Sequence, residues 1–107
     1  MTTITQYYAD INAKNYQAAY SLWVAAYQQS TSYQKFASGF ATTQNDVVQV
    51  NAATALLNGT VKVPLTIHSV NTSSSGGTVQ HTYQGYYTAG IEVDSWHLLS
   101  ASIQQTN

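Results

Sequence analysis

Residues 7–23 read YYADINAKNYQAAYSLW, and the spacing of apolar side chains in and around this stretch decides the fold. One set recurs at i, i+3, i+4 and i+7, which places it on one face of an α-helix: Ile4, Tyr7, Tyr8 and Ile11. A second set follows at helical spacing: Tyr16, Ala19, Tyr20, Trp23 and Tyr27. Between them, Asn15 is well suited to cap the second helix. The stretch therefore predicts two short helices folded over one apolar surface.

A third, shorter helix is predicted over residues 33–40. Ser32 offers a new N-cap after the polar run QQSTS, which ends the second helix. Phe36 and Phe40 supply the apolar side chains, and Gly39 stands near the predicted end. Three helices are thus expected within the first forty residues.

Beyond residue 46 the pattern changes from helical spacing to strand alternation. Residues 61–68 alternate strictly between apolar and polar side chains, and Asn58 with Gly59 forms a strong turn signal before them. The run SSSGG at 73–77 predicts a hairpin loop. Strands are expected from Val47 onwards, over 61–68, from 78 to about 90, and from 96 to 103. Helices followed by antiparallel strands predict a single α+β domain over residues 1–107.

Charge and composition exclude several classes of partner. Only 7% of the residues are charged, the basic ones are Lys14, Lys35 and Lys62, and the formal net charge is −1. We therefore expect no nucleic acid partner, because neutralising phosphates needs a basic face. No apolar run approaches the roughly 18 residues of a membrane span, so no membrane insertion is expected.

The uncharged polar surface predicts where the protein works. Ser, Thr, Asn and Gln make up about two-fifths of the chain, and a surface of this kind is commoner outside cells than within. We therefore expect an extracellular or cell-surface location. Met1 is the sole methionine, as expected if a leader or anchor was removed and a start codon was added.

In its order of elements the chain resembles the nuclear transport factor 2-like superfamily, also called SnoaL-like or cystatin-like. The resemblance rests on three segments: YYADINAKNYQAAYSLW at 7–23, SYQKFASGF at 32–40 and WHLLSASI at 96–103. It implies a cone in which three N-terminal helices pack on the concave face of a strongly curved antiparallel sheet and enclose a pocket. Relatives use such a pocket for isomerisation, dehydration, polyketide cyclisation, small-ligand binding or protein partnership. Among the members of this superfamily, the chain resembles bacterial secreted or membrane-anchored accessory domains.

Histidines are the natural candidates for acid–base chemistry at neutral pH. If the apolar sets of the two long strands face the same core, His81 points inward and His68 outward. We interpret His68 and His97 as surface or flanking residues, and His81 as a hydrogen-bonded structural residue with a role as base as the alternative. The spacing of the histidines matches no metal-site pattern, so neither metal nor cofactor is expected.

Acids are sparse and scattered. We assign capping or turn roles to all four: Asp10, Asp46, Glu92 and Asp94. No acid is predicted on the apolar face of the long strands, which argues against an isomerase of the ketosteroid type, whose site needs a buried acid. A cyclase or dehydratase would have to combine His81 with an acid from a loop.

Aromatic content is the positive signal for a site. Nine tyrosines and two tryptophans are present, and such rings line ligand cavities as readily as they fill cores. Simple core packing is therefore the alternative for each ring. The residues predicted to line a cavity are Tyr20, Trp23, Phe40, His81, Tyr83, Tyr87 and Trp96.

Two functions follow from these expectations. The first is a non-catalytic accessory domain that binds an uncharged or weakly polar small molecule, or a partner protein, in an aromatic cavity. The alternative is a small lyase, isomerase or cyclase that uses His81 as general acid or base with tyrosine hydroxyls as donors. That alternative requires His81 to reach both a second polar side chain and open cavity.

The opposite face of the sheet is expected to be polar but nearly uncharged, which suits self-association. A homodimer through this outer face is therefore predicted, with these residues on it: Thr66, His68, Gln80, Thr82, Gln84 and Tyr86.

Overall fold

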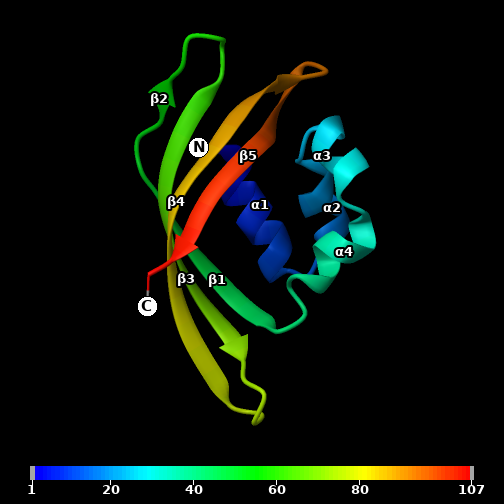
Figure 1. Cartoon of the computed structure of the whole chain (residues 1–107), viewed down its shortest axis with the longest axis vertical. Coiled ribbons are helices and arrows are strands. Elements are labelled where there is room, and N and C mark those ends of the chain that lie inside the picture. Colours follow the sequence, from blue (N-terminus) through cyan, green and yellow to red (C-terminus); the bar gives the residue numbers. More distant parts are fainter. Residues whose placement is uncertain (1, 107) are drawn as a thin grey trace.

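The computed structural model describes residues 2–106 as a layer of helices lying in the concave side of a curved antiparallel sheet (Figure 1). The helices are α1 (Thr2–Asn12), α2 (Tyr16–Ser21), α3 (Ala25–Ser30) and α4 (Tyr33–Ser38). The strands are β1 (Thr43–Val50), β2 (Thr54–Ala55), β3 (Val61–Thr72), β4 (Thr78–Glu92) and β5 (Ser95–Gln105). The predicted α+β class, with N-terminal helices on the concave face, is confirmed.

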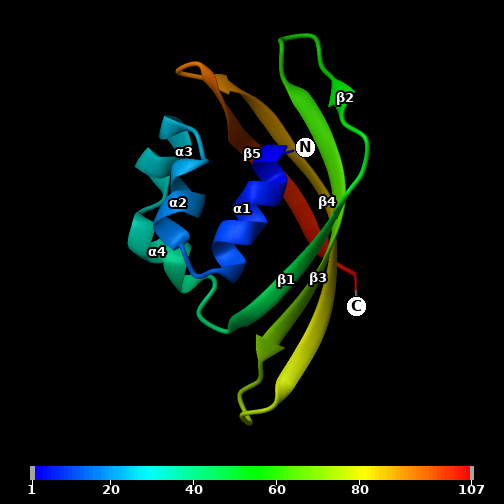
Figure 2. The ribbon, with the colours of Figure 1, turned by 180° about the vertical axis from the view of Figure 1, so that it is seen from behind.

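The sheet has the order β1-β3-β4-β5. The short strand β2 pairs with the first two residues of β3, Val61 and Lys62, while β1 pairs with the same strand from Leu65 to Asn71. β3 and β4 form one long hairpin whose register runs from Val61 opposite Ala89 to Thr72 opposite Thr78. Helix α1 lies between the sheet and the other three helices, as the view from behind shows (Figure 2). No helix within residues 2–106 is both long and apolar enough to cross a membrane.

The core forms where α1 meets the inner face of the sheet. All four residues of the predicted first stripe are at most 5% exposed: Ile4, Tyr7, Tyr8 and Ile11. They join alternate residues of β3, namely Val63, Leu65 and Ile67, in one hydrophobic cluster. The apolar residues at helical spacing in α1 and those at alternate positions in β3 therefore face the same core, as predicted.

The predicted second helix is divided into α2 and α3, so the prediction of three helices was wrong for the described chain. At the break, the backbone leaves the helix to pair with β5. Leu98 N–H donates to Leu22 O at 2.8 Å, and Val24 N–H donates to Leu98 O at 3.0 Å. Trp23, between them, forms an isolated parallel bridge with Leu98. These backbone hydrogen bonds to β5 replace hydrogen bonds within a helix. The spacing of the apolar side chains does not indicate them.

The two predicted caps have different outcomes. Asn15 makes no side-chain hydrogen bond to the start of α2, so its capping role was wrong. Ser32 Oγ accepts from Lys35 N–H at 3.1 Å, and the predicted cap of α4 is confirmed.

A glycine in the middle of β4 allows the close approach of β5. A Cβ on Gly85 would overlap the carbonyl oxygen of Ser102 and lie 2.8 Å from Ile103 Cα. Gly85 pairs with Ile103 on β5 and with Leu65 on β3, so it lies at the centre of the curved sheet. Only a residue without a side chain fits this position.

Candidate functional site

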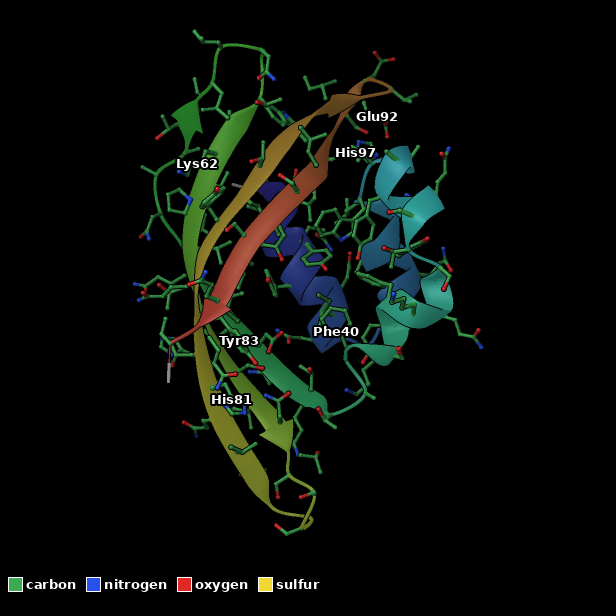
Figure 3. All side chains as sticks on the ribbon, viewed as in Figure 1. Phe40, Lys62, His81, Tyr83, Glu92 and His97 are labelled. Carbon is green, nitrogen blue, oxygen red and sulfur yellow. The ribbon has the colours of Figure 1, made fainter. Side chains whose placement is uncertain are left out.

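A cavity of about 670 Å³ opens between α1, the chain after α4 and the end of the sheet that contains the β3–β4 hairpin. Aromatic residues form much of its wall: Tyr7, Tyr8, Phe40, Tyr83 and Tyr87. Hydroxyl and amide side chains line the part near the hairpin: Thr42, Thr43, Asn71, Thr72, Ser73 and Ser74. Figure 3 shows His81 and Tyr83 on β4, with Phe40 at the lower end of the helical layer. The cavity is thus aromatic in one part and neutral polar in the other.

Four of the seven predicted cavity residues line this space: Phe40, His81, Tyr83 and Tyr87. The register explains three of them, because three inward residues of β3 pair with them: Val63 with Tyr87, Ile67 with Tyr83, and Ser69 with His81. Direct cross-strand partners share a face of the sheet. The predicted inward position of His81 is therefore confirmed, whereas ligand binding by these residues stays a prediction.

Tyr20 and Trp23 do not line the cavity but lie in the core beside it. Trp23 is 6% exposed, stacks on Tyr27 with ring centroids 4.1 Å apart and donates from Nε1 to Tyr7 OH at 3.3 Å. Tyr20 is 7% exposed and donates from its hydroxyl to Gln28 O at 2.9 Å. Both rings are packed in the hydrophobic core, so the alternative interpretation, simple core packing, holds for them.

Trp96, the last of the seven predicted residues, does not line the main cavity either. It is 37% exposed and lines a separate depression with Thr2, Thr3, Ala53 and Val61. The last strand begins at Ser95, so Trp96 sits next to the β4–β5 turn, far along the strand from Ile103, which does line the main cavity.

Asp46 is the site residue that the sequence interpretation missed. It is 7% exposed, lies inside β1 and lines the cavity. Its assigned role in a cap or turn was wrong, because β1 begins at Thr43 rather than at Val47 and so includes Asp46. The acid on the inner face thus comes from β1, not from the long strands for which none was predicted. The available signal was parity, since Asp46 alternates in step with Val48 and Val50.

The carboxyl group of Asp46 is only partly satisfied. The Ser69 hydroxyl hydrogen bonds to it, but within residues 2–106 its Oδ1 has no hydrogen-bond partner. Burial raises the pKa of Asp46 above its ordinary value, and the Ser69 bond offsets this in part. An unpaired oxygen in a buried carboxyl is costly, so a donor that reached this oxygen from outside the chain would stabilise the group.

Asp46, Ser69 and His81 form a row across three adjacent strands. Asp46 pairs with Ser69 between β1 and β3, and Ser69 pairs with His81 between β3 and β4. At about 4.8 Å per strand, the backbones of Asp46 and His81 lie roughly 10 Å apart. His81 Nδ1 is 2.9 Å from Gln105 Nε2. An amide nitrogen can only donate, so Nδ1 accepts and the ring proton of neutral His81 lies on Nε2.

The buried tyrosines act as neutral donors. The hydroxyls of Tyr8 and Tyr87 are 2.7 Å apart in the core at the cavity wall. Burial raises the pKa of the Tyr7, Tyr8 and Tyr87 hydroxyls, and the nearby charge of Asp46 raises it further. These hydroxyls therefore keep their protons at any physiological pH.

The other two histidines lie outside the cavity. His68 is exposed on β3, and its Nδ1 is 3.3 Å from Thr82 Oγ1. His97 donates from Nδ1 to Ser95 O at 2.9 Å, beside the β4–β5 turn. Both match the surface or flanking positions predicted for them.

The remaining acids also have local roles. Asp10 Oδ1 accepts from Gln6 Nε2 at 2.9 Å on α1. Glu92 Oε2 accepts from Ala25 N–H at 2.9 Å and so ties the end of β4 to the start of α3. Asp94 lies in the β4–β5 turn with a φ of 67°. The predicted cap and turn roles agree with these contacts for Glu92 and Asp94. The role predicted for Asp10 was wrong, because Asp10 lies inside α1 and bonds to a side chain one turn earlier.

These helices, the curved sheet and the cavity between them match the cone-shaped arrangement that the resemblance to nuclear transport factor 2-like proteins implied. The structure of Aln2 from a Streptomyces species is similar, with a TM-score of 0.70 over 97% of this chain and 85% of that chain. The two sequences are 11% identical, so the likeness concerns the fold alone. No protein-family model matches the sequence, and the search of curated proteins found no match.

Proposed function

We propose that the chain is a non-catalytic domain that binds a small, weakly polar molecule in the aromatic cavity. The observation that supports this most directly is Asp46, a nearly buried acid on the cavity wall whose Oδ1 has no partner within residues 2–106. A polar group left unpaired in this way costs roughly 1–3 kcal/mol, which a bound ligand would recover. Proteins leave buried polar groups unpaired mainly at functional sites.

The size and lining of the cavity support the same proposal. Its volume of about 670 Å³ falls within the roughly 300–1,000 Å³ of small-molecule sites. Tyr83 and Phe40 offer aromatic surface to an apolar body, while Asn71 and Ser73 offer neutral hydrogen-bonding groups nearer the hairpin. A ligand with one apolar part and few polar groups fits this division.

A neutral fluorescent probe tests the proposal. N-phenyl-1-naphthylamine, which is uncharged at pH 7, should gain fluorescence with saturable, one-to-one binding. Val79 lines the cavity and is 37% exposed, so Val79→Trp should block the cavity at little cost to the fold. Val47 is 56% exposed and absent from the lining, which makes Val47→Trp the matched control. Equal binding by both variants would refute the proposal.

The catalytic alternative has one specific observation in its favour. His81 meets both conditions set for it, since it lines the cavity and has the side chain of Gln105 at 2.9 Å from Nδ1. The accepting Nδ1 leaves the proton of the neutral ring on Nε2, which suits an electrophilic hydrogen-bond donor rather than a base. Long-range ¹H–¹⁵N correlation spectra identify the tautomer of His81, and a proton on Nδ1 would restore the general-base mechanism.

We further propose an extracellular or cell-surface bacterial protein that forms a homodimer through the outer sheet face. Thr66 and Gln84, directly paired on β3 and β4, lie in the centre of that face. The double variant Thr66→Lys/Gln84→Lys should give a monomer by light scattering at micromolar concentration, where the unmodified chain should give a dimer. A monomeric unmodified chain would refute the dimer, and its retention in the cytoplasm of the source cell would refute the location.

A further inference from the structure

We infer that the polar group of the bound molecule is a protonated amine, which pairs with the Asp46 carboxylate while its apolar body packs on the aromatic wall. This inference rests on the proposed function, because it requires that the cavity bind a small molecule. It goes further by naming the charge and the donor chemistry of that molecule.

The charge of the cavity wall favours a cation. Within residues 2–106, Asp46 is the only acid on the lining, and no lysine lies there. The chain contains no arginine. Lys14, the lysine bonded nearest to the site, is exposed and donates from Nζ to Thr43 O at 3.2 Å. An anionic ligand would therefore meet an uncompensated carboxylate, whereas a cation would supply the missing opposite charge.

The hydrogen-bonding capacity of Asp46 favours a group with several donors. An ionised carboxylate has about four acceptor positions, and the Ser69 hydroxyl occupies one of them. Oδ1 has no partner within the described chain. An ammonium group has three donors and no acceptor, so it can bond to this carboxylate without leaving a new acceptor unpaired. Such charge-assisted bonds are about twice as strong as neutral ones.

The aromatic lining suits the carbon atoms next to a cationic nitrogen. Asp46 is close enough to Tyr7, Tyr8 and Tyr87 for its charge to raise the pKa of each hydroxyl. The negative ring faces of tyrosine and phenylalanine attract ammonium groups within about 6 Å of the ring centre. An amine that reached Asp46 from the cavity would thus meet a wall of aromatic and neutral polar side chains without a competing lysine in the described chain.

Three probes of one shape separate the charge from the shape. These are 2-naphthylmethylamine, which is protonated at pH 7, neutral 2-naphthylmethanol and anionic 2-naphthoate. In calorimetric titrations of the full chain, the amine should bind at least about tenfold more tightly than the alcohol, given the strength of charge-assisted bonds. The naphthoate should bind more weakly than either. Equal affinity for amine and alcohol would overturn the inference yet leave the proposed function standing; no binding by any probe would overturn both.

A substitution tests whether the Asp46 carboxylate causes the preference for the amine over the alcohol. Asp46→Asn keeps the shape and removes the charge, so the tenfold preference for the amine should disappear while the alcohol binds as before. Asp94→Asn removes the same charge from an exposed turn and should leave the preference unchanged. Retention of the full preference in Asp46→Asn would overturn the inference.

The pH dependence of the unmodified chain gives a second measurement if Asp46→Asn does not fold. Protonation of Asp46 should weaken amine binding as the pH falls through the pKa of Asp46, while alcohol binding stays constant. The other titratable groups facing this site are Tyr7 and Tyr8 from α1, and His81, Tyr83 and Tyr87 from β4. Burial raises the pKa of the Tyr7, Tyr8 and Tyr87 hydroxyls, so these three stay neutral throughout. A His81→Asn variant excludes any contribution from the imidazole. Amine affinity independent of pH in that variant would overturn the inference.

Discussion

Asn12 and Asp46 are joined by two hydrogen bonds between a side-chain amide and a strand backbone. Asn12 Nδ2 donates to Asp46 O at 2.7 Å, and Asp46 N–H donates to Asn12 Oδ1 at 2.8 Å. The end of α1 therefore holds β1 at the residue whose carboxyl group lines the cavity. The amide takes the place that a further strand would otherwise fill.

Asn12→Ala should destabilise the fold by about 1–3 kcal/mol, because both backbone groups of Asp46 lose their partner in a half-buried position. Asn15→Ala is the matched control, since Asn15 is exposed and makes no capping bond to α2, so its effect should stay within about 0.5 kcal/mol. Urea denaturation measures both variants. Equal losses from the two substitutions would contradict a specific role for Asn12.

Gly85→Ala should destabilise the fold by about 2–3 kcal/mol, since the new methyl group would overlap Ser102 O and force β4 and β5 apart. Gly77→Ala provides the comparison, because a Cβ there would meet Ser73 Oγ at an ordinary 3.8 Å. Thermal unfolding followed by circular dichroism should show a clear fall in Tm for the first and almost none for the second. A Tm unaffected by Gly85→Ala would show that β5 adjusts freely.

Tyr8→Phe should cost about 1–3 kcal/mol, because it leaves the Tyr87 hydroxyl buried without the partner now 2.7 Å away. Tyr8→Phe/Tyr87→Phe removes both hydroxyls and should cost less than the sum of the single losses. A double-mutant cycle in urea measures the difference. Additive single effects would mean that the two hydroxyls do not stabilise each other.

Asp46→Asn should raise Tm at pH 7. Burial raises the pKa of Asp46 in the folded chain above its ordinary value of 3.8, so the folded chain takes up a proton at a higher pH than the unfolded chain. The charged form therefore lowers stability above the folded pKa, and this cost is lost as the pH falls towards 3.8. The gain from Asp46→Asn should accordingly shrink on acidification to about pH 4.

The exposed Asp94→Asn variant serves as the control for that experiment and should leave Tm nearly constant across the same pH range. A gain from Asp46→Asn that grows as the pH falls would reverse the sign and refute the argument.

The sequence predicted the elements whose pattern comes from burial. Ile4, Tyr7 and the rest of the first stripe had to face the sheet, and the alternation around Leu65 set the register that turns His81 inward. These patterns depend only on which residues share a face of a helix or strand. The fold class, the main hairpin and four of the cavity residues follow from them.

The sequence did not predict features that depend on contacts between distant backbones. The break at Trp23 arises from pairing with Leu98, 75 positions later in the chain. Asp46 belongs to a strand because Asn12 and Ser69 bond to it from other elements, although Gln44, Asn45 and Asp46 form a polar run with weak strand propensity. No local sequence pattern indicates such pairings, so Asp46, the acid of the cavity, was assigned to a cap or turn rather than to the wall of a site.

The backbone bonds at both margins of the sheet also affect how this chain survives at high concentration. Leu22 and Val24 occupy part of the outer margin of β5, and Asn12 with Lys14 occupies part of that of β1. Open strand margins recruit further copies and lead to fibres. These bonds cover part of both margins, so we expect variants that loosen them to become prone to aggregation before they lose their helices.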